Sequence, residues 1–302
     1  MPPSSGTTSP GFAIPGAISG PVESVRTFVG DAVRSRIGGE GGRALIAELA
    51  SDAPGWFGED SPTRIVHADA AMFVGGMRAL LLQSMHPVAM AAVADNSAFR
   101  SDPWGRLQRT AAFLTETTFG SAGRAEAACR RVRSVHRRVR GETADRVTYR
   151  ADDPELLLWV HVAEVDSFLD AHRRYGRVEL TDAQQDAYVA EMSMVARHLG
   201  VIDPPLDRAA LAEALARFRP VLGASDQARA GARFLLKPPG LSLAARPAYS
   251  ALLAGAVTSL PWWVRLDLRL PLIGPVTGRV LVPMITGSTL GAMRWALEAP
   301  VT

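Results

Sequence analysis

Six histidines, at positions 67, 86, 136, 161, 172 and 198, are the side chains of this sequence best suited to bind a metal or a haem iron. Two of them, His136 and His161, stand in distinctly apolar helical surroundings. A buried imidazole needs a partner. That partner is either a backbone carbonyl, the commoner outcome, or a metal or haem iron. His172, near the end of a predicted helix, is expected to be exposed.

His136 lies on a predicted helix, 122–140, whose two faces differ. The apolar face carries His136 together with Cys129, Val132, Val135 and Val139, so the imidazole is predicted to point into the core. The other face carries arginines at 130, 131, 133, 137, 138 and 140. Such a stripe could meet an anionic ligand. Because no aromatic residues interleave with it, we interpret the stripe as a solvated helix face.

His161 is followed one helical turn later by Glu164, within the predicted helix 154–173. Residues three apart share a helix face. Glu164 could therefore orient the imidazole, or the pair could supply two ligands of a non-haem iron site. A di-iron bundle would need further carboxylates from facing helices. The candidates for that role are Glu116, Asp186 and Glu191.

Arg106, Arg109 and Thr110 form a third polar group, at the start of a predicted helix. The spacing places them on neighbouring faces. Two guanidinium groups can bind carboxylates such as haem propionates, and a hydroxyl can donate a hydrogen bond to a distal water or oxygen species. The alternative is that the arginines cap neighbouring helices or form surface ion pairs.

The elements that position these residues are predicted to be helices. Asp153-Pro154-Glu155 is typical of a helix start, and Thr181 to Gln184 has the spacing of a capping box before a helix that Gly200 ends. Alternating strand patterns are nearly absent, so the predicted fold class is all-α. Further helices are predicted at about 64–84, 103–119, 122–140, 207–218, 225–235, 246–258 and 275–298, the last interrupted at Pro283.

Composition indicates one globular helical domain. The chain has 302 residues, of which 47% are hydrophobic, enough for a continuous core. We predict a flexible arm at 1–20 and a single domain at 21–302. The net charge is only +3, and arginine replaces lysine except at Lys237, so we expect no nucleic-acid partner. The one cysteine excludes an intrachain disulfide and any multi-cysteine metal site.

Nothing in the first residues reads as a signal peptide, and we expect a cytoplasmic protein. The longest uncharged run, near Pro247 to Val264, is interrupted by prolines and is not expected to span a membrane. Peripheral contact of this region with a membrane surface remains an alternative. The same region, with the pair Trp262-Trp263 and the apolar run to Val282, is either the last layer of the core or the frame of an entry for an apolar substrate.

The order of short motifs along the chain resembles the MpaB family of oxygenases, which includes the latex-clearing proteins. The resemblance covers roughly residues 60–205 and extends weakly beyond. Its motifs are Met85-His86-Pro87, Phe99 to Pro103, Arg106 to Thr110, Thr118-Phe119-Gly120, Val135-His136 to Gly141, Tyr149 to Asp152, and Trp159-Val160-His161.

This resemblance implies a globin-like helical core that encloses haem b, with a histidine as the proximal iron ligand. By motif order that role is carried to His136, with His161 as the alternative. The family's distal Arg-x-x-Lys-Thr run corresponds to Arg106 to Thr110, with arginine at position 109 in place of lysine. Because arginine stays protonated, we expect that Arg109 does not ligate the iron.

A second departure concerns the catalytic base. Latex-clearing proteins use a glutamate upstream of the distal run, but between Gly76 and Thr110 the acidic residues here are Asp95 and Asp102. Shared fold does not fix shared chemistry. The base therefore has no counterpart in the sequence at that place.

The resemblance implies a haem-b-dependent oxygenase or peroxygenase that uses dioxygen or peroxide to oxidise a hydrophobic small molecule, such as an isoprenoid or lipid, with cleavage of a carbon–carbon double bond as one such reaction. Arg106, Arg109 and Thr110 are its candidate catalytic residues. The alternatives are a haem- or lipid-binding protein without turnover and a purely structural helical protein. A homodimer is compatible with either function.

Overall fold

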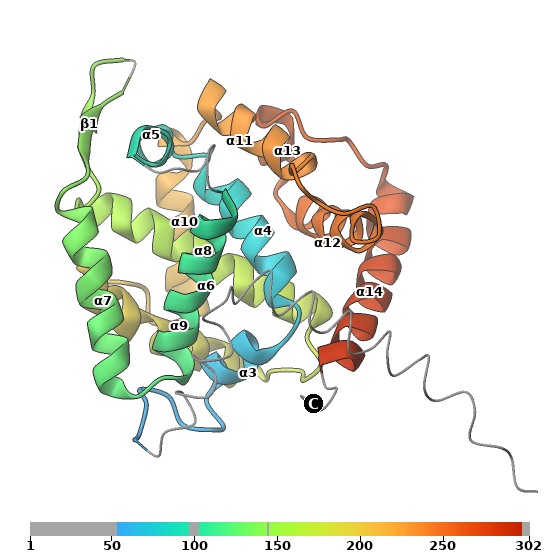
Figure 1. Ribbon diagram of the computed structural model, residues 1–302, viewed down its shortest axis with the longest axis horizontal. Helices are drawn as coiled ribbons and strands as arrows, with labels where there is room; N and C mark the ends of the chain where they lie inside the picture. The colour runs from blue at the N-terminus through green and yellow to red at the C-terminus, as the bar shows by residue number, and fades with distance from the viewer. Residues whose placement is uncertain (1–52, 97–102, 144, 298–302) are drawn as a thin grey trace, which may run out of the picture.

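A 22-residue helix, α8 (Pro154–Tyr175), runs through the middle of the protein and packs against α3, α4, α9 and α10. The structure is a computed structural model that describes residues 53–96, 103–143 and 145–297 (Figure 1). Asp153 caps α8 by accepting a hydrogen bond from the Glu155 amide at 2.9 Å, and Pro154 fills the first helical position. The predicted helix at 154–173 is confirmed, and the all-α fold class is confirmed for these residues.

The helix α4 (Met72–Gln83) makes the most extensive contact with α8. Two residues of α4 produce this close contact. Gly75 lies directly against the backbone and ring of Phe168. One turn later, the buried Arg78 reaches Asp166 at 2.7 Å and the Ser167 hydroxyl at 2.7 Å. The pair therefore combines close backbone approach with a buried charge network.

Gly75→Ala is expected to lower the free energy of unfolding by about 1–3 kcal/mol, as overpacking does in a closed core. A Cβ at position 75 would lie 2.6 Å from the Phe168 ring and 3.2 Å from the Ser167 carbonyl oxygen, so α4 and α8 would have to separate. The neighbouring Gly76 is the matched control, because a Cβ there meets Phe168 at 3.9 Å. Gly76→Ala should be neutral or stabilising. Denaturant unfolding of both variants tests this, and equal destabilisation would contradict it.

The segment predicted as one helix at 64–84 is two helices, α3 (Pro62–Ala68) and α4, at an angle of 94°. The chain turns at Asp69, whose backbone is extended and whose carboxylate accepts a hydrogen bond from the Ala71 amide at 2.7 Å. Arg294 binds the same carboxylate at 2.6 Å. The break is thus stabilised by a residue 225 positions away.

The helix α7 (Ala122–His136) ends four residues earlier than predicted. It is followed by a short hairpin of β1 (Arg140–Glu142) and β2 (Thr148–Arg150), which pair antiparallel with Gly141 opposite Tyr149. The hairpin was not predicted. Glycine is favoured at 141 because a Cβ there would clash with the Tyr149 hydroxyl and ring. That hydroxyl donates a hydrogen bond to Asp95 at 3.0 Å, which ties the hairpin to the end of α5.

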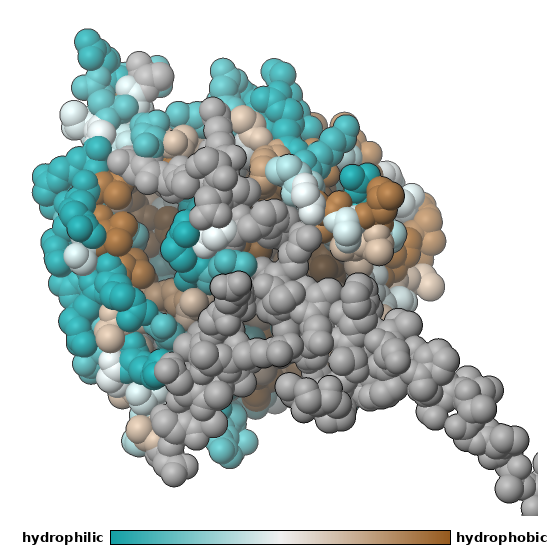
Figure 2. Space-filling view, viewed as in Figure 1, coloured by the Kyte–Doolittle hydropathy of each residue, from teal (hydrophilic) through white to brown (hydrophobic). Residues whose placement is uncertain are grey.

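The C-terminal helices form a layer over α4. Within it, α12 (Arg246–Ser259) packs against α4 on one side and against α14 (Val282–Leu297) on the other. Apolar side chains gather on the outer surface of this layer, on the right of Figure 2. The predicted interruption at Pro283 is wrong in position: Pro283 lies in the first turn of α14, and the irregularity is a π-helical turn, η2 (Thr277–Leu281), directly before that helix.

The remaining helices agree with the predictions to within two residues, apart from α5 and α13, which were not predicted. Within the described ranges, no single helix is long and apolar enough to span a membrane, although α3 and α4 together would pass by length and composition. The predicted arm at 1–20 lies outside the described residues. The remaining bounds are α5 Pro87–Asn96, α6 Pro103–Phe119, α9 Asp182–Leu199, α10 Arg208–Phe218, η1 Arg219–Val221, α11 Asp226–Leu236 and α13 Trp262–Asp267.

Candidate functional site

His161 is buried on α8, and its Nε2 atom has no hydrogen-bond partner among the described residues. Burial lowers the pKa of His161 to about 4. The imidazole is therefore neutral at physiological pH, and a nitrogen lone pair can face the interior. A neutral imidazole nitrogen without a protein partner is suited to bind iron.

Glu164 follows one turn after His161, and Phe168 follows one turn after Glu164, so the three share one face of α8. Burial raises the pKa of Glu164 to about 7. Glu164 is half-buried, whereas His161 is 8% exposed. The Glu164 carboxyl is poised to take up or release a proton near neutral pH.

His67 on α3 links α6 and α9 beside this face of α8. Its Nδ1 lies 2.8 Å from the Thr118 hydroxyl, and its Nε2 lies 3.2 Å from the Tyr188 hydroxyl. The His67 ring also meets Phe168 edge to face. Burial, followed by the charge of His172, lowers the pKa of His67 to about 3. His67 is thus a neutral hydrogen-bonded residue that orients Tyr188 and Thr118.

The hydroxyl of Tyr188 is electrostatically coupled to Glu164. Burial is the main cause that raises the Tyr188 pKa well above its ordinary value, and the negative charges of Glu164 and Glu191 add to it. Sequence reasoning missed both His67 and Tyr188. The Thr118-Phe119-Gly120 motif was the sequence feature that pointed to this region. It did not indicate that α3, α6 and α9 meet there through His67.

Glu164→Gln is expected to flatten the pH dependence of stability. Because the folded pKa of about 7 lies above the ordinary 4.5, the carboxyl binds its proton more tightly in the folded protein. This contribution is fully present below pH 4.5 and is lost as pH rises through 7. The variant should therefore unfold with a free energy about 1–3 kcal/mol higher than the parent at alkaline pH.

Thermal or denaturant unfolding across this pH range measures the effect. Glu213→Gln is the matched control, because Glu213 is exposed on α10, and it should follow the parent. A Glu164→Gln variant that loses stability with rising pH as steeply as the parent would show that this carboxyl is not the group responsible.

His136 is the last residue of α7, and its Nδ1 is buried without a hydrogen-bond partner among the described residues. Burial lowers the pKa of His136, and the charge of Asp152 opposes that shift. The arginines on the outer face of α7 are exposed, and two of them pair with Glu126 and Glu116. The interpretation of the stripe as a solvated face is confirmed.

Arg106 and Arg109 lie close enough on α6 to affect one another. Burial, and then the charge of Arg109, lowers the pKa of Arg106. The Arg106 side chain is half-buried, and the Arg109 side chain is exposed. The Thr110 hydroxyl is exposed and donates to the Arg106 carbonyl of its own helix at 3.1 Å. The structure thus places the two arginines close together, whereas the Thr110 hydroxyl is hydrogen-bonded within its own helix.

Figure 2 shows apolar surface in a hollow beside the polar outer surface of α7, and α6 and α7 pack against each other. His136 belongs to α7, Arg106 and Thr118 belong to α6, and both helices pack toward α3 or α9. The helices α3, α6, α7, α8 and α9, which carry the candidate residues, therefore form one group of mutually packed helices.

The other candidate ligands are engaged elsewhere. The prediction that His172 is exposed is wrong: the residue is buried, and its Nε2 lies 2.8 Å from the Val178 carbonyl oxygen beyond the helix end. His198 stacks on Trp56, and His86 contacts Trp159 and Phe218. Burial raises the pKa of the Cys129 thiol to about 11, which makes it a poor nucleophile and ligand.

The di-iron alternative is not supported within the part of the chain that the structure describes. No group of three or more His, Cys, Asp or Glu side chains there could hold a metal ion. The three carboxylates required by that alternative bind other partners: Glu116 pairs with Arg131, Asp186 with Arg208, and Glu191 accepts from Ser61 at 2.6 Å.

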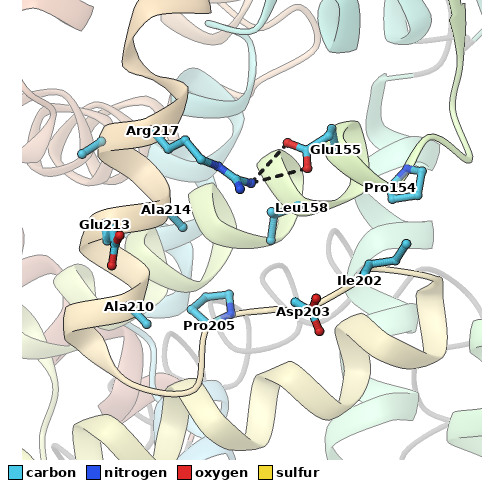
Figure 3. A pocket seen from close by; sticks show the side chains of 11 residues that line it. Pro154, Glu155, Leu158, Ile202, Asp203, Pro205, Ala210, Glu213, Ala214 and Arg217 are labelled. Carbon is cyan, nitrogen blue, oxygen red and sulfur yellow. Dashed lines mark hydrogen bonds and ion pairs between the residues drawn. The ribbon is translucent and has the colours of Figure 1, made fainter.

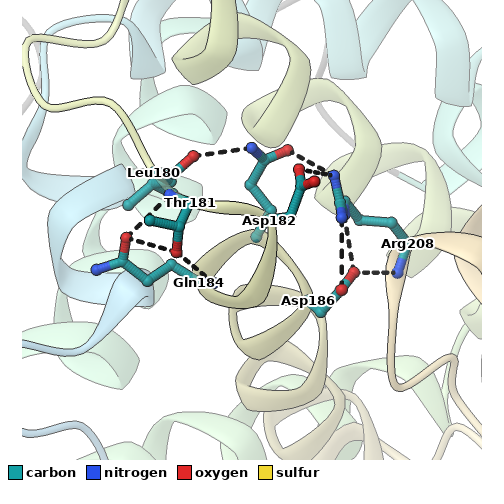
Figure 4. A network of polar contacts seen from close by, with 7 residues as sticks. Leu180, Thr181, Asp182, Gln184, Asp186 and Arg208 are labelled. Carbon is teal, nitrogen blue, oxygen red and sulfur yellow. Dashed lines mark hydrogen bonds and ion pairs between the residues drawn. The ribbon is translucent and has the colours of Figure 1, made fainter.

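A separate depression of about 640 Å³ lies between α8 and α10 (Figure 3). It contains none of the candidate residues. Glu155 and Arg217 form an ion pair across it at 3.2 Å, and both side chains are exposed. Beside it, Arg208 at the start of α10 binds Asp182 and Asp186, each at 2.8 Å, next to the Thr181–Gln184 capping box of α9 (Figure 4). These polar contacts join α10 to α8 and to α9, so we assign them a structural role.

A family model described as ER-bound oxygenase mpaB/B'/Rubber oxygenase, catalytic domain, matches residues 64–296. The chain belongs to this family. The match extends through α14, well beyond the 60–205 region in which the motifs are dense. The mpaB/rubber oxygenase assignment makes the protein a member of an oxygenase family. No curated protein and no solved structure matches the chain significantly.

Proposed function

We propose that this mpaB/rubber oxygenase family member is a haem-b-dependent oxygenase that oxidises a hydrophobic small molecule of the isoprenoid or lipid class. The observation that carries the proposal is that His136 Nδ1 and His161 Nε2 are buried without a hydrogen-bond partner among the described residues; His172 Nδ1 is a third such nitrogen, on a ring that the Val178 carbonyl already holds. Buried nitrogens without partners are rare unless a ligand satisfies them. Membership of an oxygenase family makes an iron cofactor the fitting ligand.

The side chains fit such a cofactor. Both imidazoles have lowered pKa values, so each is a neutral ligand. By motif order His136 is assigned as the proximal ligand, with His161 as the alternative. The half-buried Arg106, together with the exposed Arg109, would bind the propionate carboxylates of haem b. When bound, haem supplies the iron at which dioxygen or peroxide is activated.

The protein's own residues would supply positioning and proton transfer. Glu164 lies one turn after His161 on α8, and its pKa of about 7 would let it accept a proton from the substrate and release it later. It takes the place of the glutamate that the sequence lacks upstream of Thr110. The Tyr188 hydroxyl contacts His67 Nε2 at 3.2 Å and lies near enough to Glu164 for that charge to raise the Tyr188 pKa. Apolar walls exclude water and orient an alkene.

Oxygen uptake tests this function. The haem-loaded protein is supplied with squalene, an isoprenoid with double bonds, or with squalane, its saturated counterpart. We expect oxygen uptake and carbonyl products with squalene alone. Oxygen uptake without carbonyl products would exclude double-bond cleavage. Haem binding without uptake under either condition would favour the non-catalytic haem- or lipid-binding alternative.

A further inference from the structure

The outer surface of the C-terminal layer is unusually apolar for a surface without a partner. Trp262 on α13 is 67% exposed, Leu272 in the following loop is 74% exposed, and Met284 on α14 is 64% exposed. We name this surface the C-terminal apolar face, made of Trp262, Leu272, Val276, Leu281, Met284 and Ile285. Contiguous exposed apolar surface of this kind marks an interaction site.

On α14, the exposed apolar side chains form a continuous outer side of the helix. Val282, Thr286, Leu290 and Met293 face inward against α12, as expected for a docked helix. The opposite side, from Leu281 through Met284, Ile285 and Ser288 to Trp295, is exposed and carries no charged residue except Arg279 just before it. A solvated helix has a polar outer face. This helix is apolar on both faces, so its outer face requires an apolar partner.

The adjacent tryptophans have different environments. Trp263 lies under the Arg219 guanidinium, 3.8 Å from the ring centroid, and packs against the core. Trp262 points outward at the start of α13. Both tryptophans keep accessible surface, Trp262 much more than the half-buried Trp263. An exposed tryptophan beside aliphatic side chains is typical of residues that anchor proteins at the membrane interface.

The segment that forms the C-terminal apolar face is rich in basic residues. Between Lys237 and Leu297 the acidic residue is Asp267 alone, whereas there are six basic residues. Arg294 is bound to Asp69, and the other five, Lys237, Arg246, Arg265, Arg269 and Arg279, belong to the same segment as the face. Basic residues near apolar anchors are attracted to anionic lipid headgroups.

We propose that the C-terminal apolar face docks the protein on the surface of an anionic lipid bilayer, with Trp262, Met284 and Ile285 inserted among the lipids. A second copy of the chain fits the face less well. In a two-fold dimer the same patch meets itself, which would place these basic residues opposite one another. The proposal does not depend on the bound cofactor or on the oxygenase activity.

Co-sedimentation of the full chain with vesicles tests the proposal. The vesicles are pure phosphatidylcholine or an equal mixture of phosphatidylcholine and phosphatidylserine. We expect binding to the anionic vesicles that weakens as salt is raised. The double variant Trp262→Ser/Ile285→Ser should bind about tenfold or more weakly, because it removes two inserted apolar side chains.

Ile202→Ser is the matched control, because Ile202 is 63% exposed in the loop between α9 and α10, away from this face. It should bind vesicles as the parent does. Light scattering without lipid completes the experiment. The proposal is overturned if the parent binds no anionic vesicles, or if the double variant binds them like the parent. A parent that binds no vesicles but is a dimer that the double variant converts to a monomer is the form of this outcome that names another occupant. The latter result would assign the face to a second copy.

Discussion

His136→Ala is expected to abolish stoichiometric haem binding. His136 offers a buried nitrogen without a partner and a pKa lowered by burial, and removing a sole proximal ligand removes the covalent attachment of the iron to the protein. The control is His198→Ala, because His198 already bonds the Met194 carbonyl oxygen and stacks on Trp56. Haem content per chain and the visible spectrum are measured for both variants.

The same measurement on His161→Ala decides between the two candidate ligands. His161 has its Nε2 unpaired and lies beside Glu164, so its loss should alter the spectrum without releasing haem. If His136→Ala keeps an unaltered Soret band while His161→Ala loses haem, the proximal role belongs to His161.

Arg78→Ala is expected to cost about 3 kcal/mol of the free energy of unfolding, as the loss of one partner from a buried ion pair does. Arg78 is 6% exposed, and its guanidinium binds Asp166 at 2.7 Å and lies 3.6 Å from Asp170. Without it, Asp166 loses its counter-charge at the contact of α4 and α8, and Asp170 keeps Arg174. Because these carboxylates retain some solvent contact, the loss should fall at the lower end of the range for buried pairs.

Arg174→Ala is the matched control for Arg78. Arg174 binds the same Asp170 at 2.8 Å, but its side chain is largely in solvent, so the loss should stay below about 1 kcal/mol. Denaturant midpoints of the two variants test the difference. Equal losses would mean that burial of Arg78 contributes nothing to the stability of the α4–α8 contact.

The helices that sequence predicted best are those whose ends are encoded locally. Asp153 with Pro154 starts α8, and the Thr181–Gln184 box starts α9, because caps act within one turn of chain. The break at Asp69 could not be predicted in this way, since its stabilising partner is Arg294. The early end of α7 was missed because a Gly141–Tyr149 pairing across a hairpin replaced the helix.

The candidate site shows the same division. His136 and His161 could be chosen from local apolar periodicity, and the structure buries a nitrogen of each. The contact of His67 with Thr118 and Tyr188 joins residues 51 and 121 positions apart, so no local pattern indicates it. His172 was misjudged because the partner that lets it be buried, the Val178 carbonyl, lies in the turn after its helix.

The absorption spectrum of freshly purified protein tests the central claim most directly. If the buried imidazoles hold haem b, the protein will show a Soret band, and the pyridine haemochrome assay will report haem b in an amount equimolar with the chain. Apoprotein obtained by haem extraction should regain that spectrum on titration with haemin. A folded protein that is colourless as purified and takes up no haemin would contradict the assignment of a haem-dependent oxygenase.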